Sequence, residues 1–97
     1  MVEENVVVRA NVNRNVIAPA DLPAFYANDT QLQMTPWDVR FMFGVIADVD
    51  AEQSVATVQR VADVRISLQH AKRIAAILTE QIRQYEAKVG IIAVPEG

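Results

Sequence analysis

The chain contains no cysteine and few glycine, histidine or aromatic residues. Its 97 residues include three glycines, one histidine and 6% aromatic residues. Without cysteine, neither a disulfide framework nor a thiolate metal site can form. His70 has no second histidine or carboxylate at helical spacing, so it provides no metal site of its own. We therefore predict no metal and no cofactor.

The sequence also lacks segments that direct a chain into or across a membrane. No run of about 18 apolar residues is present from which a transmembrane helix could form. The start, MVEENVVVRANVNRN, carries acidic residues first and differs from a secretory signal peptide. We expect a cytoplasmic protein without membrane contact.

Charge and catalytic motifs are equally sparse. Nine basic and 12 acidic residues give a net charge of −3, which disfavours a dedicated nucleic-acid binder. No glycine-rich phosphate loop exists, and Ser54 and Ser67 lack a nucleophile-elbow sequence. The carboxylates near the predicted strand ends are more typical of solvated turns than of acid–base pairs. We predict that the protein is not an enzyme.

The chain does contain one strongly amphipathic segment, at residues 67–90. Its apolar residues recur at alternating spacings of four and three, which predicts a helix with one apolar stripe. Ser67 is the predicted N-cap, accepting from the backbone N–H of Gln69 or His70, and Gly90 is predicted to follow the last turn in a left-handed conformation. The residues expected to face a sheet or a second subunit are Ala71, Ile74, Ala75, Ile77, Leu78, Ile82 and Tyr85.

Three segments before this helix show the alternation typical of strands. They cover residues 25–34, 39–49 and 55–66. A reverse turn is predicted at residues 35–38, because Pro36 suits the second position of a type I turn. Gly44 is expected at a bulge or a close backbone approach, and Arg60 and Val61 interrupt the alternation of the third strand as a bulge does.

This order predicts an α+β fold. We expect an antiparallel meander of three to four strands, followed by one long C-terminal helix packed on the sheet. Residues 24–97 form the predicted β-β-β-α domain, and residues 1–23 an N-terminal arm or edge strand. Alternating valines favour a paired strand within residues 1–17, whereas four asparagines favour a flexible arm, so both interpretations stay open.

A sheet covered by a single helix leaves one face without cover. We expect the helix to cover the face that carries Phe41 and Phe43. The second face would then either be exposed to solvent or be covered by a partner. The side chains assigned to that second face are Leu32, Met34, Met42 and Ile46. With 52% hydrophobic residues in so short a chain, burial against another copy is favoured, and we expect a homodimer or larger assembly.

The predicted function is that of a small interaction protein, which self-associates and binds another protein or an extended peptide segment. The candidate partner-binding residues are Trp37, Asp38, Arg40, Met42 and Ile46. Trp37 is either an exposed anchor at the turn or part of the core over the sheet edge. The alternative function is that of a nucleic-acid-binding accessory protein, which would use Arg60, Arg65, Lys72 and Arg73.

Several short motifs within residues 25–92 resemble a small prokaryotic family that is known only as a domain of unknown function. The motifs are Tyr26-Ala27-Asn28, Thr35-Pro36-Trp37-Asp38, Phe43-Gly44, His70-Ala71-Lys72 and Tyr85-Glu86 followed by Gly90. The resemblance implies the order strand–strand–strand–helix and no particular activity. The layout is also similar to that of SecB-like export chaperones, whose sheets and helices assemble into oligomers with apolar client grooves.

Overall fold

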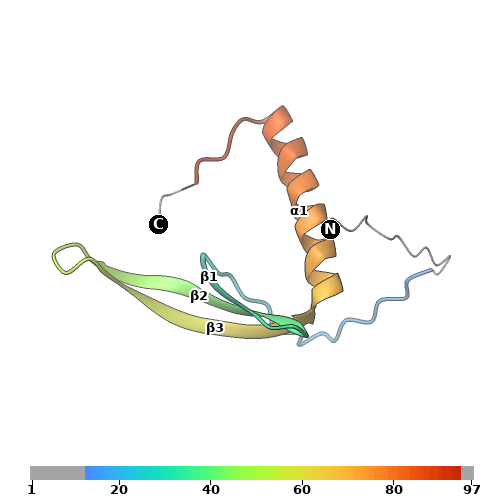
Figure 1. Cartoon of the computed structure of the whole chain (residues 1–97), viewed down its shortest axis with the longest axis horizontal. Coiled ribbons are helices and arrows are strands. Elements are labelled where there is room, and N and C mark those ends of the chain that lie inside the picture. Colours follow the sequence, from blue (N-terminus) through green and yellow to red (C-terminus); the bar gives the residue numbers. More distant parts are fainter. Residues whose placement is uncertain (1–12, 95–97) are drawn as a thin grey trace.

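The structure, a computed structural model, describes residues 13–94 (Figure 1). Its elements are β1 (Asp29–Met34), β2 (Asp38–Asp50), β3 (Val55–Ser67) and α1 (Leu68–Lys88). The strands form one antiparallel sheet in the order β1-β2-β3. The α+β class, the meander and the long C-terminal helix are confirmed, with three strands in the described part of the chain.

The segment before β1 is irregular. Residues 13–28 contain no strand, so the first strand begins at Asp29, four residues later than predicted. The backbone N–H of Asn28 donates to the Gly44 oxygen, and its side-chain oxygen accepts from the N–H of Ile46, at 3.0 and 2.9 Å. These two bonds fix where the chain joins the sheet. Of the predicted N-terminal arm, residues 1–12 lie outside the described residues.

A bulge interrupts the β2–β3 ladder near its centre. Phe43 pairs with Ala62 but Gly44 pairs with Arg60, which leaves Val61 as the extra residue. The bulge predicted at Arg60 and Val61 is therefore confirmed, with Val61 as its extra residue.

Gly44 lies at the close backbone approach that the sequence predicts. It is buried, and a Cβ added to it would lie 2.5 Å from Cγ1 of Val58 and 3.0 Å from the oxygen of Gln59. Neither distance leaves room for a methyl group, so β2 and β3 can approach this closely only because position 44 is glycine.

Beyond Gly44 the sheet narrows to two strands. β1 pairs with β2 only over residues 39–44, so residues 45–50 and 55–59 form a projecting hairpin arm (Figure 1). Ala47 is an extra residue within this arm, because Ile46 pairs with Val58 and Asp48 with Thr57. Every residue from 46 to 57 is exposed. A two-stranded ribbon is marginally stable on its own, so this arm gains little support from the single chain.

The ends of α1 agree with the predicted caps. The hydroxyl of Ser67 accepts from the backbone N–H of His70 at 3.1 Å, which satisfies one of the free donors of the first turn. Gly90 follows the helix with a φ of +136°, a backbone conformation that glycine adopts at least cost.

The position of α1 differs from the prediction that it packs along the sheet. It follows β3 without an intervening residue and rises away from the end of the sheet (Figure 1). No residue of α1 is buried, and half-burial of the apolar stripe is confined to Ala71 and Ile74 near its start. Turning a helix back over the preceding strand ordinarily takes a loop of about 2–6 residues. Because that loop is missing here, the rest of the helix does not cover its own sheet.

The single chain therefore buries little. Val39, 2% exposed, is the one buried hydrophobic residue in the described part of the chain, and 9392 Å² of surface is accessible to solvent. A compact folded monomer of this size would expose about 5,500 Å². The radius of gyration is 17.5 Å, against about 12–13 Å for a compact domain of this length.

Candidate interaction surface

One side of the sheet is almost wholly apolar. Directly paired residues of antiparallel strands point to the same side, so the register defines a three-by-three set of side chains, which we call the apolar face. Thr30 is its single polar member. The apolar face consists of Thr30, Phe43 and Ala62 in one row, Leu32, Phe41 and Val64 in the next, and Met34, Val39 and Ile66 in the third.

Four of the nine side chains of the apolar face are exposed to solvent, and the others except Val39 are half-buried. Leu32 is 62% exposed and Met34 72% exposed. Phe41 and Phe43 are half-buried and stack on each other with their ring centroids 5.7 Å apart. Large apolar side chains that lie together in the open are typical of surfaces that bind a partner.

A shallow hollow of about 340 Å³ lies at one end of the apolar face. Residues of all three strands and of the segment that precedes β1 line it. The lining residues are Phe25, Ala27, Thr30, Phe43, Ala62 and Val64. The hollow is large enough to receive a bulky apolar side chain.

The opposite side of the sheet is polar, contrary to our expectation. Leu32 and Met34 pair with Phe41 and Val39, so they lie on the apolar face and not on the second face beside Met42. Met42 instead has Gln31 and Asp63 as its neighbours across the strands. The prediction of a second apolar face was wrong, because it placed the side chains of Leu32 and Met34 on the same face as Met42. The uncovered apolar surface is instead the face that carries Phe41 and Phe43.

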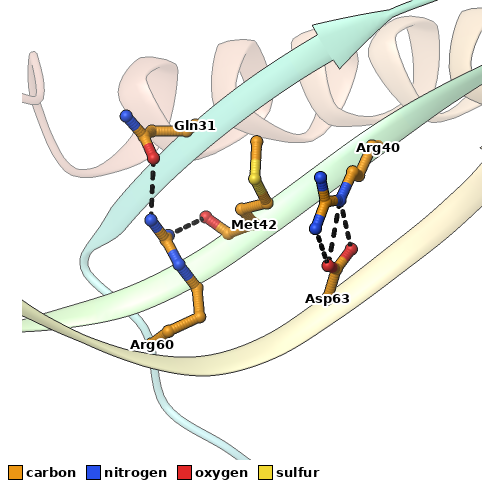
Figure 2. A network of polar contacts seen from close by, with 5 residues as sticks. All are labelled: Gln31, Arg40, Met42, Arg60 and Asp63. Carbon is orange, nitrogen blue, oxygen red and sulfur yellow. Dashed lines mark hydrogen bonds and ion pairs between the residues drawn. The ribbon is translucent and has the colours of Figure 1, made fainter.

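Ion pairs and hydrogen bonds hold this polar side together (Figure 2). The Nε of Arg40 donates to both carboxylate oxygens of Asp63, at 3.0 and 2.9 Å. Arg60 donates to the backbone oxygen of Met42 at 2.6 Å and to the side-chain oxygen of Gln31 at 2.7 Å. Arg60 thereby links all three strands, since Gln31 belongs to β1, Met42 to β2 and Arg60 to β3.

The contact between Arg40 and Asp63 shifts the pKa of both groups. The hydrogen bonds from Arg40 hold the pKa of the Asp63 carboxyl below its ordinary value, and the same contact raises the pKa of Arg40. Asp63 is therefore a charged member of a structural pair rather than a proton donor at neutral pH.

A second uncovered surface runs along α1. We call it the helix stripe, and its members fall on one side of the helix at spacings of three and four. From Ala75 onward these side chains are exposed. The helix stripe consists of Ala71, Ile74, Ala75, Leu78, Ile82 and Tyr85.

The other side of α1 is charged. Arg83 donates to Glu80 at 2.7 and 2.9 Å, and Gln84 donates to the same carboxylate at 3.1 Å. These bonds lower the pKa of Glu80 to about 2. Ile77 belongs neither to the helix stripe nor to the charged side of α1. Its side chain is 49% exposed, so the chain itself does not cover it.

The apolar face and the helix stripe meet at Val39. Val39 is buried, whereas Met34, its neighbour on the same face, is largely exposed. Ala71 and Ile74 are the members of the helix stripe that are half-buried. The start of α1 thus leans over the Val39 end of the sheet, and the two surfaces form the walls of an open corner, which we call the apolar corner.

The turn between β1 and β2 displays Trp37. The hydroxyl of Thr35 accepts from the backbone N–H groups of Trp37 and Asp38, at 3.1 and 3.0 Å, and donates to the Asp38 carboxylate at 2.8 Å. These bonds fix the backbone of the turn without any contribution from the indole, which is 82% exposed. The indole is therefore exposed and does not belong to the core over the sheet edge, whereas its role as a binding anchor stays a prediction.

The other candidate partner-binding residues have different surroundings. Asp38 is engaged by Thr35, and Arg40 by Asp63. Met42 is half-buried on the polar side, whereas Ile46 is exposed on the hairpin arm. Trp37 and Ile46 therefore remain the accessible members of this group.

The four basic residues of the alternative prediction are all exposed. Arg60 and Arg65 lie on β3, and Lys72 and Arg73 on the first turns of α1. Arg60 is already engaged by Met42, Gln31 and, at 4.0 Å, the carboxylate of Asp29. Its guanidinium is thus committed to the sheet.

Two other kinds of site are absent from the part of the chain that the structure describes. No group of three or more His, Asp or Glu side chains in residues 13–94 is arranged to hold a metal ion. The helix in this part of the chain does not combine the length and apolar character needed to cross a membrane.

These features define a small α+β domain with an open three-stranded sheet, an unpacked helix and an uncovered apolar corner. The chain belongs to the family described as "Protein of unknown function (DUF3467)", whose model matches residues 2–94. The resemblance to a family of unknown function is confirmed. No curated protein and no solved structure matches the chain, so the similarity of layout to SecB-like chaperones stays a prediction from the sequence.

Proposed function

We propose that this protein is a non-enzymatic interaction module of the cytoplasm, which self-associates and then binds an extended segment of another protein. The observation that carries the proposal is the apolar corner, where a sheet face and a helix stripe both lie open to solvent. Burial of such surfaces is the main source of free energy in folding and in association.

The amount of open surface supports self-association. The chain exposes about 3,900 Å² more than a compact monomer of its size, and this excess includes the irregular residues 13–28 and the hairpin arm as well as the apolar corner. Obligate oligomers bury on the order of 2,000–5,000 Å² at an interface, counted over both partners, and these interfaces resemble a domain core cut in half. The apolar corner fits that description, because its two walls would form the core of an ordinary domain if they were brought together.

The outer edge of β1 supports the binding of an extended segment. β1 is an edge strand of the described sheet, and it pairs with β2 without a register shift. Its sequence, DTQLQM, contains no proline or lysine, which are residues that proteins commonly place on edges to prevent strand addition. A peptide in extended conformation can add to such an edge through backbone hydrogen bonds.

Trp37 provides an anchor beside this edge. It follows β1 by two residues and is exposed on a turn whose backbone is already fixed by Thr35. Exposed tryptophans that become buried on binding often contribute a large share of the affinity. The alternative function, nucleic-acid binding, draws less support because Arg60 is engaged within the sheet.

Light scattering coupled to size-exclusion chromatography tests self-association. The wild-type protein should have the mass of a dimer or larger at micromolar concentration. Ile82→Glu should shift it toward the monomer, because it places a carboxylate in an apolar interface. Ala76→Glu is the matched control, since Ala76 lies on the charged side of α1 and its substitution adds the same charge. A wild-type monomer at high micromolar concentration would refute self-association.

Titration with a short labelled peptide of alternating valine and threonine tests binding at the β1 edge. The peptide should show saturable binding by fluorescence polarisation, and Trp37, the one tryptophan of the chain, should change its emission. Trp37→Ala should weaken binding without changing the assembly, because the indole is not part of the core. An intact assembly that gives neither signal would refute this part of the proposal.

A further inference from the structure

We propose that the apolar face is covered by the helix stripe of a second copy of this chain, and that the two copies exchange their helices reciprocally. The proposal rests on the self-association proposed above and adds which surfaces meet. Each chain would contribute an open corner, and two corners related by a twofold axis would interlock with the helix of each lying on the sheet of the other.

The junction between β3 and α1 is the first argument. Ser67 ends β3 and caps α1, so no loop residue separates the two elements. The hydrogen bond from His70 to Ser67 caps α1 directly at the end of β3. Without a loop at this junction, α1 has no segment that would turn it back onto its own apolar face. We therefore expect the cover to come from another chain.

The helix stripe is long enough to cover the apolar face. From Ala71 to Tyr85 the helix stripe rises about 21 Å, at about 1.5 Å per residue. From Val39 to Phe43 the apolar face runs about 14 Å along the central strand, at about 3.4 Å per residue. A helix laid along the strand direction would cover the apolar face from one end to the other.

The chemistry of the two surfaces also matches. The helix stripe contains no charged residue, and the apolar face contains no charge and one hydroxyl, that of Thr30. No unpaired charge would be buried when the surfaces meet, so the largest cost of burial is avoided. The hollow beside Phe43 can take a large side chain of the incoming helix. A polar peptide would gain nothing comparable from this face.

A twofold exchange accounts for both surfaces with one interface. Each chain gives one helix stripe and one apolar face, so a reciprocal pair satisfies both at the same time, as closed symmetric dimers do. Helices paired only with each other would leave the apolar face open. Sheets paired only through their faces would leave the helix stripe open.

Thiol cross-linking of co-expressed single-cysteine variants tests the exchange. The chain has no cysteine of its own, so each introduced thiol is unique. Leu78 lies midway along the helix stripe and Leu32 in the middle row of the apolar face, and both are exposed in the single chain. Leu78→Cys on an untagged chain and Leu32→Cys on a size-tagged chain should give a mixed cross-linked product with a short bismaleimide.

A matched pair of variants provides the control. Ala76→Cys lies on the charged side of α1, and Gln33→Cys on the polar side of the sheet, where Gln33 pairs with Arg40. Co-expression of this pair should give several-fold less mixed product than Leu78→Cys with Leu32→Cys, because these positions face away from the interface.

The other outcomes separate the exchange from self-association itself. An assembly in which Leu78→Cys cross-links mainly to another Leu78→Cys chain would overturn the exchange and keep self-association. A cross-link within one chain of a Leu32→Cys/Leu78→Cys double variant, at monomer mass, would show that α1 covers its own sheet and would overturn both. A mixed product equal to that of the control pair, with the assembly intact, would overturn the exchange alone.

Discussion

Leu32 lies directly opposite Phe41 in the β1–β2 ladder, on the side of the sheet that faces the corner with α1, and yet 62% of its surface is exposed. Residues with this position in an ordinary α+β domain are covered by a helix. Here α1 begins directly after Ser67, which pairs with Asp38 beyond the row of Val39, and the helix rises away from the sheet (Figure 1). The exposure of Leu32 opposite Phe41 thus shows that the apolar face of this sheet is not buried by the helix of its own chain.

Replacing Gly44 should destabilise the sheet. The added methyl group of Gly44→Ala would meet Cγ1 of Val58 at 2.5 Å and the oxygen of Gln59 at 3.0 Å, and overpacking of this kind costs about 1–3 kcal/mol. Denaturant unfolding at fixed protein concentration measures the change in the free energy of unfolding. Shortening Val58 removes the closest contact, so Gly44→Ala should cost less in a Val58→Ala background than in the wild type. An equal cost in both backgrounds would contradict the assignment of the clash to Val58.

The pKa of Asp63 should depend on Arg40. The hydrogen bonds from Arg40 lower this pKa in the folded protein. A carboxyl group with a lowered folded pKa stabilises the protein above its ordinary unfolded pKa, and this contribution is lost as the pH falls through the folded value. Arg40→Gln should therefore raise the pKa of Asp63 and reduce the loss of stability on acidification.

Titration of the Asp63 carboxyl carbon by NMR measures this pKa directly. Arg65→Gln is the control, because Arg65 lowers the pKa of Asp63 only through its charge and without a hydrogen bond. The increase in pKa should be larger for Arg40→Gln than for Arg65→Gln. The reverse order would show that the Arg40–Asp63 contact is not maintained in solution.

Removing the cap of α1 should weaken the junction between β3 and the helix. Ser67→Ala deletes the hydroxyl that accepts from the N–H of His70, and loss of an N-cap typically costs about 1 kcal/mol. Ser67→Asp keeps an acceptor at the same place and should retain most of the stability. Both values come from denaturant unfolding at fixed protein concentration. Equal stabilities for the alanine and aspartate variants would contradict a capping role.

Features set by a few neighbouring residues could be predicted from the sequence. The cap at Ser67, the positive φ of Gly90 and the close approach at Gly44 each depend on the chemistry of one residue in its local backbone. The bulge at Val61 was visible because an extra residue breaks a period of two. These local signals were sufficient for the element order and the α+β class.

The pairing of β1 with β2 could not be predicted with the same success. A shift of one residue moves every side chain of a strand to the other face, and the alternation within residues 25–34 does not define which face meets which. Alternation alone therefore predicts Leu32 and Met34 beside Met42, whereas they pair with Phe41 and Val39. The polar network of Arg40, Arg60 and Asp63 was missed for the same reason, since it depends on residues brought together across strands.

The direction of α1 was the other feature that the sequence did not define. Its apolar stripe predicts that one side is buried and does not say against which chain. The informative signal was that Ser67 alone separates Ile66 from Leu68. A helix that packs back on the preceding strand needs a longer connecting loop. Exposure of the helix stripe follows from this missing loop.

The most direct test of the account is a mixing experiment with two variants, followed by light scattering. Leu32→Glu disables the apolar face and Leu78→Glu disables the helix stripe, and each should be monomeric alone, because both helix–face contacts of its dimer would then bury a glutamate. A mixture should regain the mass of a dimer, at lower affinity than the wild type, since one of its two helix–face contacts joins an intact helix to an intact face. Two variants that stay monomeric when mixed, while the wild type is dimeric, would contradict the reciprocal exchange.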